Sequence, residues 1–331
     1  MNQHRLLSGF VMLLVSITIF SFGLSANNIS VVQTMSGIFS TSLMPVVEVL
    51  FAFLCLYGAG YLVTLFLLKK DDKALLHSLE FTYLCVLLGA VLVSGLLFLL
   101  GIASLLRPEI ILLLKVIFSL VGGLALVRIP ADTRNIGQKL RTPSYIVEKI
   151  FQATISFFVL LILFGATSSP TVFVDAMAYH FGLPWLFLQD HAIRFYPTNA
   201  GSGQYLAGDL LYLLTLHSDD PWHIFSTKLF NASLEAFIFV AIFLSVRRNG
   251  ASRVYAYAAS ILLLSVPAIY LWGTGKNDLF IAGLCLSVFW MFRIYEANRS
   301  DVWLYCMFLL GGFAVSVNVT IGDRPLLISA H

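Results

Sequence analysis

Long apolar runs alternate with short polar connections along most of the chain. Nine of them approach the roughly 20 residues that a helix needs to cross about 30 Å of hydrocarbon. Their continuous character predicts membrane helices, because strands of a membrane barrel alternate in polarity. The nine predicted spans are Leu6–Ala26, Leu43–Leu68, Leu79–Ala103, Pro108–Val127, Ile150–Ala166, Trp222–Val246, Val254–Trp272, Asp278–Tyr295 and Val302–Val317.

The first run also has features of a signal peptide, with Arg5 ahead of an apolar core and small residues near Ala26. Leu24 fits a cleavage site poorly, so a membrane anchor is the favoured interpretation.

One long segment, residues 171–222, does not resemble a span and holds much of the chain's polar chemistry. Within it, the apolar run Tyr205–Leu216 is too short to cross a bilayer. That run is expected to lie as a helix in the membrane interface, with Asp209 as its one carboxylate.

Composition agrees with a membrane protein, because 59% of the residues are hydrophobic and only 11% are charged. An ordinary soluble domain has about 25% charged residues. The fold class expected is all-α and polytopic, with four spans in residues 1–128, a linker at 129–149 and the remaining spans in 150–331. The net charge of +3 is small, so no nucleic-acid partner is expected.

Basic residues set the expected orientation of the spans. Most of the 20 Lys and Arg residues fall in one alternate set of connections. The opposite set holds only Arg107, Arg194, Lys276 and Arg324. By the positive-inside rule, the N-terminus is cytoplasmic and the 171–222 loop is extracytoplasmic.

Asp175 is the first candidate in that loop, and two interpretations of it stay open. It follows the fifth span directly and is a good helix N-cap, which explains the residue without catalysis. In such a helix Asp175 and Tyr179 share one face, which also suits a catalytic pair. Asp219 and Asp220 precede Pro221 and are expected to be caps.

Metal-ligand patterns are weak throughout the chain. His180 and His191 have no third ligand at zinc spacing, so no metal residue is predicted. The four cysteines, Cys55, Cys85, Cys285 and Cys306, lie in apolar runs and are interpreted as small buried hydrophobic residues.

Ionisable residues inside spans are costly and therefore indicate function by default. Glu48, Lys115 and Lys228 lie five to seven residues from the outer ends of their spans, about 10 Å deep. Each Lys can extend outward to a lipid phosphate, or the three groups pair with one another for structural reasons. Glu235 lies deeper on the face of Lys228, too far to reach the loop easily.

A family resemblance rests on three stretches: DAMAYHFGLPWLF, then GQYLAGDLLYLL with the span opening at DPWHIFSTKLFN, and SVPAIYLWGTGKNDLFIAG. These resemble the GT-C superfamily of lipid-dependent membrane glycosyltransferases, over residues 150–317. The resemblance implies a bacterial inner-membrane enzyme that transfers a sugar from a polyprenyl-phosphate donor to an extracytoplasmic acceptor.

The resemblance, together with the ionisable residues of the loop and the neighbouring spans, gives a set of candidate site residues. Asp175 matches the family's loop carboxylate and is grouped with Tyr179 and His180 as catalytic. Arg194, Asp209, Lys228, Lys276 and Asp278 are expected to bind substrate. Whether a divalent metal takes part is left open.

Two features keep other interpretations open. The family usually continues through further spans, whereas here the ninth span ends in NVTIGDRPLLISAH, which predicts a truncated or frame-shifted product, and an inactive fragment is one interpretation of it. A secondary transporter or flippase, or a non-catalytic membrane scaffold, also fits a polytopic chain. Against a transporter, no repeated halves are visible, and the ionisable residues gather at one face rather than at the midplane.

Overall fold

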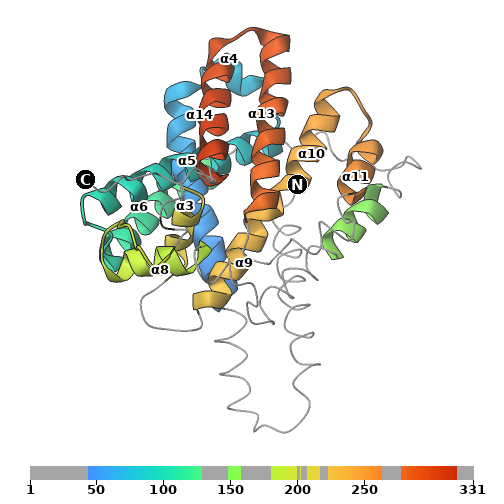
Figure 1. Ribbon diagram of the computed structural model, residues 1–331. Coiled ribbons are helices and arrows are strands. Elements are labelled where there is room, and N and C mark those ends of the chain that lie inside the picture. The colour runs from blue at the N-terminus through green and yellow to red at the C-terminus, as the bar shows by residue number, and fades with distance from the viewer. Residues whose placement is uncertain are drawn as a thin grey trace, which may run out of the picture.

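The computed structural model describes residues 44–128, 148–157, 180–199, 202, 207–216, 223–262 and 277–318. Every regular element in these ranges is a helix (Figure 1). They are α3 (Met44–Leu67), α4 (Lys70–Ala74), α5 (Ser78–Ile102), α6 (Pro108–Arg128), α8 (Gly182–Gln189), η4 (Asp209–Leu214, a 3₁₀ helix), α9 (His223–Glu235), α10 (Phe237–Arg248), α11 (Arg253–Leu262), α13 (Asp278–Asn298) and α14 (Asp301–Asn318). Residues 148–157 are also helical.

Five helical stretches are long and apolar enough to cross a membrane, namely Met44–Leu67, Ser78–Ile102, Pro108–Val127, Phe225–Arg248 and Asp278–Asn298. They confirm the second, third, fourth, sixth and eighth predicted spans as long apolar helices. These helices are typical of an integral membrane protein. The ninth predicted span corresponds to the shorter apolar helix Asp301–Val317. The first lies outside the described residues, and the fifth and seventh are described only in part.

The stretch Phe225–Arg248 is not one uninterrupted helix. It consists of α9 and α10, which meet at Ala236. Glu235, the last residue of α9, is buried beside this break. The carbonyl of Phe237, just after the break, accepts a hydrogen bond from the Tyr83 hydroxyl of α5 at 3.4 Å. A polar contact therefore supports the backbone where the helix is interrupted.

Glycines let the first three long helices approach one another closely. Gly60 of α3 faces Cys85 and Gly89 of α5, and a Cβ at Gly60 would overlap the Cys85 carbonyl. Gly58 faces α6 in the same way, against the backbone of Phe118. Small residues at such contacts are the usual means of packing helices in membranes, where lipid is as apolar as the helix surface.

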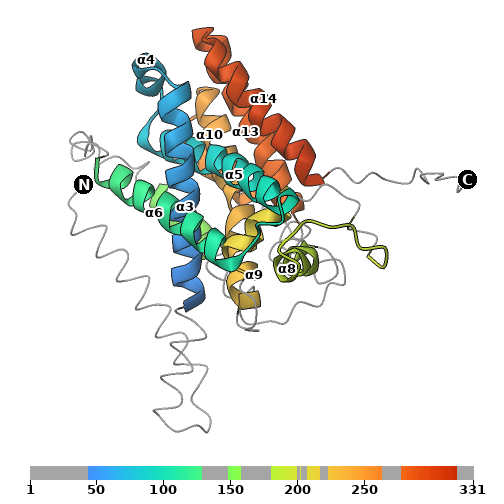
Figure 2. The ribbon, with the colours of Figure 1, turned by 90° about the vertical axis from the view of Figure 1, so that its left-hand side faces the viewer.

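The early and late helices form one body rather than separate units. A single core of buried residues includes α3, α5, η4, α9, α13 and α14. In that core α3 packs on both α5 and α9, and α14 packs on α5. Figure 2 shows α3, α5 and α10 overlapping in the centre, with α14 along one side. Helices from both halves of the sequence therefore share one hydrophobic core.

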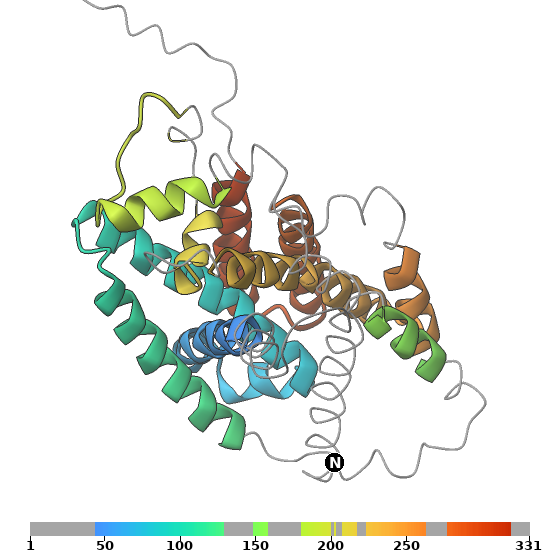
Figure 3. The same ribbon diagram turned by 90° about the horizontal axis from the view of Figure 1, so that it is seen from below.

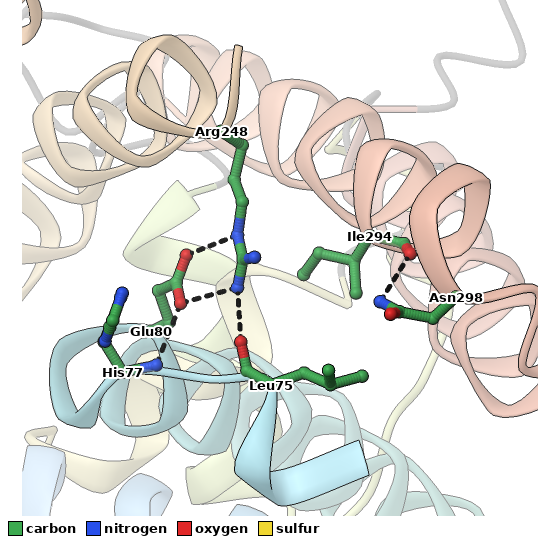
Figure 4. A network of polar contacts seen from close by, with 6 residues as sticks. All are labelled: Leu75, His77, Glu80, Arg248, Ile294 and Asn298. Carbon is green, nitrogen blue, oxygen red and sulfur yellow. Dashed lines mark hydrogen bonds and ion pairs between the residues drawn. The ribbon is translucent and has the colours of Figure 1, made fainter. Parts of the chain in front are cut away.

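At one end of the bundle an ion pair links α10 to α5. The Arg248 guanidinium donates through Nε and Nη2 to the two Glu80 carboxylate oxygens at 2.7 Å, and Nη2 also donates to the Leu75 carbonyl at 2.7 Å (Figure 4). Glu80 also accepts the backbone N–H of His77 at 2.9 Å, which caps α5. We call Glu80, Arg248 and the Leu75 carbonyl the clamp.

The clamp lies at the end of the bundle that the charge pattern predicts to be cytoplasmic. It joins the start of α5 to the end of α10, close to α4, which carries Lys70 and Lys73. The described part of the chain therefore brings together helix ends that the predicted topology assigns to one side.

Candidate functional site

At the opposite end, η4 enters the helix bundle instead of lying on its surface. All six of its residues are buried, and it packs against α5, α6, α8 and α9. The expected interfacial helix at Tyr205–Leu216 is thus replaced by a short buried one. In a 3₁₀ helix side chains three residues apart are eclipsed, so Asp209, Tyr212 and Thr215 form one polar row.

The Asp209 carboxylate, at the start of this row, pairs with His180. The His180 Nδ1 lies 2.9 Å from Asp209 Oδ1. The Asp209 side chain is 2% exposed and that of His180 is 15% exposed, so the histidine forms the accessible edge of the pair. His180 directly precedes Phe181 and helix α8, which fixes its position at the rim of the bundle.

Asn277 provides the second partner of Asp209. Its Nδ2 donates to Asp209 Oδ1, and its Oδ1 accepts from the Tyr212 hydroxyl at 2.5 Å. Asn277 occupies the N-cap position of α13, where an Asn side chain normally caps the helix, but it makes no capping hydrogen bond. The amide that would cap α13 is used for the buried carboxylate instead.

Tyr212 connects this cluster to α9 through the side-chain amide of Asn231. One phenolic proton cannot serve the amide oxygens of both Asn231 and Asn277. The chemistry is satisfied when the Asn231 amide is reversed, so that Nδ2 donates to the Tyr212 oxygen. Reversal also gives an acceptor to Asn231 Nδ2, which otherwise has none among the described residues. We call His180, Asp209, Tyr212, Asn231 and Asn277 the polar network.

Burial dominates the electrostatics of the polar network. Burial raises the pKa of Asp209 above its ordinary value, while the nearby His180 and the Asn277 hydrogen bond act in the opposite direction. The pKa of Tyr212 is raised well above its usual range, first by burial and then by the charges of Asp209 and Glu235. Glu235 was expected to lie too deep to reach the loop easily. Its charge nevertheless affects the pKa of Tyr212, because η4 descends into the bundle.

Side chains from the early helices hold both ends of η4. Ser94 of α5 donates to the carbonyl of Ala207, just before the helix. Lys115 of α6 is buried and donates through Nζ to the Leu214 carbonyl at 2.8 Å. A cation suits the carbonyl end of a helix. Lys115 thus has a structural partner in the protein, rather than the lipid phosphate considered from the sequence.

The predicted site residues separate into three groups. Asp175, Tyr179 and Lys276 lie outside the described residues, so their roles stay predictions. His180 and Asp209 are brought together. Asp209 is buried behind the histidine, and its expected contact with substrate stays a prediction.

The remaining predicted residues lie on α9, at the start of α13 and in the loop after α8. Lys228 is buried on α9, one turn before Asn231. Asp278 is exposed, while its neighbour Asn277 points into the network. Arg194 is also exposed, with its nearest carboxylate, Asp190, 3.9 Å away.

Asn277, Tyr212 and Asn231 belong to the network but were not predicted from the sequence. Two signals were available: an Asn directly before an apolar helix, and the polar residues of Asp209–Thr215 at every third position. In the described ranges no group of three potential ligands could hold a metal ion. Comparison of the chain with protein-family models, curated proteins and solved structures gives no match.

Proposed function

We propose that the protein is a membrane glycosyltransferase that moves a sugar from a polyprenyl-phosphate donor to an acceptor hydroxyl. The observation that carries this proposal is the His180–Asp209 pair, with its histidine at the accessible edge and its carboxylate buried. A buried carboxylate that fixes one ring nitrogen of a histidine prepares the other nitrogen to act as a base.

In the proposed reaction Nδ1–H of His180 donates to Asp209, and Nε2 takes the proton of the acceptor hydroxyl. The acceptor oxygen then forms a bond to the anomeric carbon of the sugar. The bond between that carbon and the phosphate oxygen breaks, and polyprenyl phosphate leaves with the electron pair. Asp209 stabilises the positive charge that develops on His180.

Asn277 and Tyr212 have supporting roles in this scheme. Asn277 donates to the oxygen of Asp209 that faces His180, which holds the carboxylate in one orientation. Tyr212 holds Asn277 in turn. A network fixed in this way loses little energy to reorganisation during the reaction.

The test uses membranes that contain the full chain and undecaprenyl phosphate carrying radiolabelled glucose, mannose or N-acetylglucosamine in turn. His180→Gln is expected to lower transfer from the accepted donor by about 10²–10⁴, the usual contribution of a general base. The matched control is His191→Gln, because His191 is exposed and lies outside the network. Equal transfer by His180→Gln and wild type would remove His180 from the proposal.

A proton-coupled transporter is the second candidate, and one observation favours it. The polar network runs from the rim to α9, whose last residue, Glu235, is buried at a helix break. Interrupted helices and buried carboxylates are typical of transporter sites. Liposomes with a trapped pH dye test it: a potential-driven proton flux that Glu235→Gln abolishes favours transport, and no flux above empty liposomes excludes it.

A further inference from the structure

Helix α8 and residues 190–199 form a projecting rim beside the polar network, which we call the lip. Helix α8 buries Leu183, Pro184, Phe187 and Leu188 against the bundle. Its opposite face presents Trp185, which is 44% exposed, together with Gln189 one turn later. The lip therefore has a large aromatic residue on the side that faces away from the protein.

The loop that follows α8 is held in place by specific contacts. The Tyr196 hydroxyl donates to Asp190 Oδ2 at 2.8 Å, and the Tyr196 ring stacks on Phe187 at a centroid distance of 6.0 Å. Burial, and then the neighbouring Asp190, raise the pKa of Tyr196 to about 12. Phe195 is nevertheless 69% exposed. Phe195 therefore adds a second large aromatic side chain, beside Trp185, to the exposed surface of the lip.

Backbone hydrogen bonds join the lip to the turn between α5 and α6. The N–H of Leu106 donates to the His191 carbonyl at 3.0 Å, and the N–H of Ile193 donates to the Gly101 carbonyl at 3.1 Å. That turn has exposed apolar side chains of its own at Ile102 and Leu105. Figure 3 shows α8 lying along the end of α5 where α6 begins.

The exposed apolar surface continues from this turn along α6. Its exposed side chains there are Leu112, Leu113, Val116, Ile117, Leu120 and Leu124. This face of a membrane helix is covered by acyl chains. The lip is thus continuous with an exposed apolar face of a helix long enough to cross a membrane, and the exposed Arg107 and Arg194 mark its polar margin. Trp and Tyr with basic neighbours are the usual residues of the headgroup boundary.

We propose that the lip is immersed in the adjacent lipid leaflet, with Trp185 and Phe195 below the phosphodiester headgroups. Interfacial helices insert their apolar face about 5–10 Å into that boundary. Since His180 directly precedes α8, a ligand would reach it from the membrane side. This inference is independent of the proposed transfer reaction, and α8 takes the interfacial position that the sequence predicted for Tyr205–Leu216.

Fluorescence quenching tests the inference in vesicles made from lipids brominated at different depths. The wild-type emission minus that of Trp185→Phe isolates the signal of Trp185 from the other four tryptophans. We expect lipids brominated near the headgroup end of the chain to remove most of this difference signal, and aqueous iodide to leave it nearly unchanged.

A second probe protects the test against a poorly folded variant. Phe195→Trp is introduced separately into the wild-type protein, and the emission that it adds is expected to show the same quenching. If iodide quenches the Trp185 signal or the Phe195→Trp signal and no brominated lipid quenches it, the lip lies in water and the inference is overturned. If neither iodide nor brominated lipid quenches these two signals, protein covers the lip, and this result also overturns the inference.

Discussion

The two ends of the bundle each bury a carboxylate, but they neutralise it in different ways. At the clamp, Glu80 meets the two nitrogens of Arg248, an always-charged partner in bidentate geometry. In the polar network, Asp209 meets the His180 imidazole and the neutral amide of Asn277. The first arrangement fixes the positions of helices, whereas the second keeps a carboxylate whose protonation can change.

Removing Glu80 should have the largest effect on stability. Glu80→Ala leaves Arg248 near the protein interior with only the Leu75 carbonyl, and it also removes the cap at His77. Breaking a buried pair costs about 3–5 kcal/mol, and the partly exposed Arg248 places this change near the lower value. The free energy of unfolding, measured in mild detergent titrated with denaturing detergent, is the readout.

The chain offers a matched control for that change. Arg293 and Glu296 also form an ion pair, but both side chains are more than one-third exposed. Glu296→Ala should therefore cost less than about 1 kcal/mol. Equal losses for the two variants would show that the clamp is no more than a surface ion pair.

Lys115→Met should have a smaller effect, located at η4. The change keeps the apolar stem and removes the hydrogen bond to the Leu214 carbonyl. A hydrogen bond to a charged group contributes about 1.5–3 kcal/mol. Amide hydrogen exchange should rise in residues 209–216 and stay unchanged at the clamp. Unaltered exchange in η4 would contradict its anchoring by Lys115.

The pH dependence of stability should reveal Asp209 through a still smaller effect. Because its folded pKa is raised, the folded protein holds a proton that the unfolded chain has already lost. Stability from this residue is therefore full below the ordinary Asp pKa and falls as pH rises from that value to the folded pKa. Thermal unfolding across pH should show this fall in wild type relative to Asp209→Asn. If the stability of wild type relative to Asp209→Asn rose with pH, the folded pKa of Asp209 would be lowered instead of raised, which contradicts the prediction.

Hydrophobicity predicted the long helices well and the buried polar contacts poorly. The span Pro108–Val127 agrees at both ends, because a predominantly apolar run of 20 residues leaves a helix few alternatives in lipid. Asp209–Leu214 was misplaced because an apolar run with one carboxylate fits an interface or a protein interior equally well. Burial was decided by tertiary partners, Ser94 and Lys115, which lie far away in the sequence.

The candidate site was predictable only in part for the same reason. Scarcity of charge drew attention to His180 and Asp209, but nothing in their spacing showed that they meet. Asn277 was not among the predicted site residues, whereas its neighbour Asp278 was, as a substrate-binding residue. Only the fold shows that the Asn277 side chain faces η4 while that of Asp278 is exposed.

The most direct measurement of the account compares Asp209→Asn with Glu80→Ala in the same membranes. Sugar transfer from the accepted polyprenyl-phosphate donor and the free energy of unfolding are measured for both. The account predicts that Asp209→Asn lowers kcat by about 10²–10⁴, leaves KM unchanged and retains near wild-type stability. Glu80→Ala should lose stability but keep kcat per folded molecule. Wild-type kcat in Asp209→Asn, or the opposite pattern between the two variants, would contradict it.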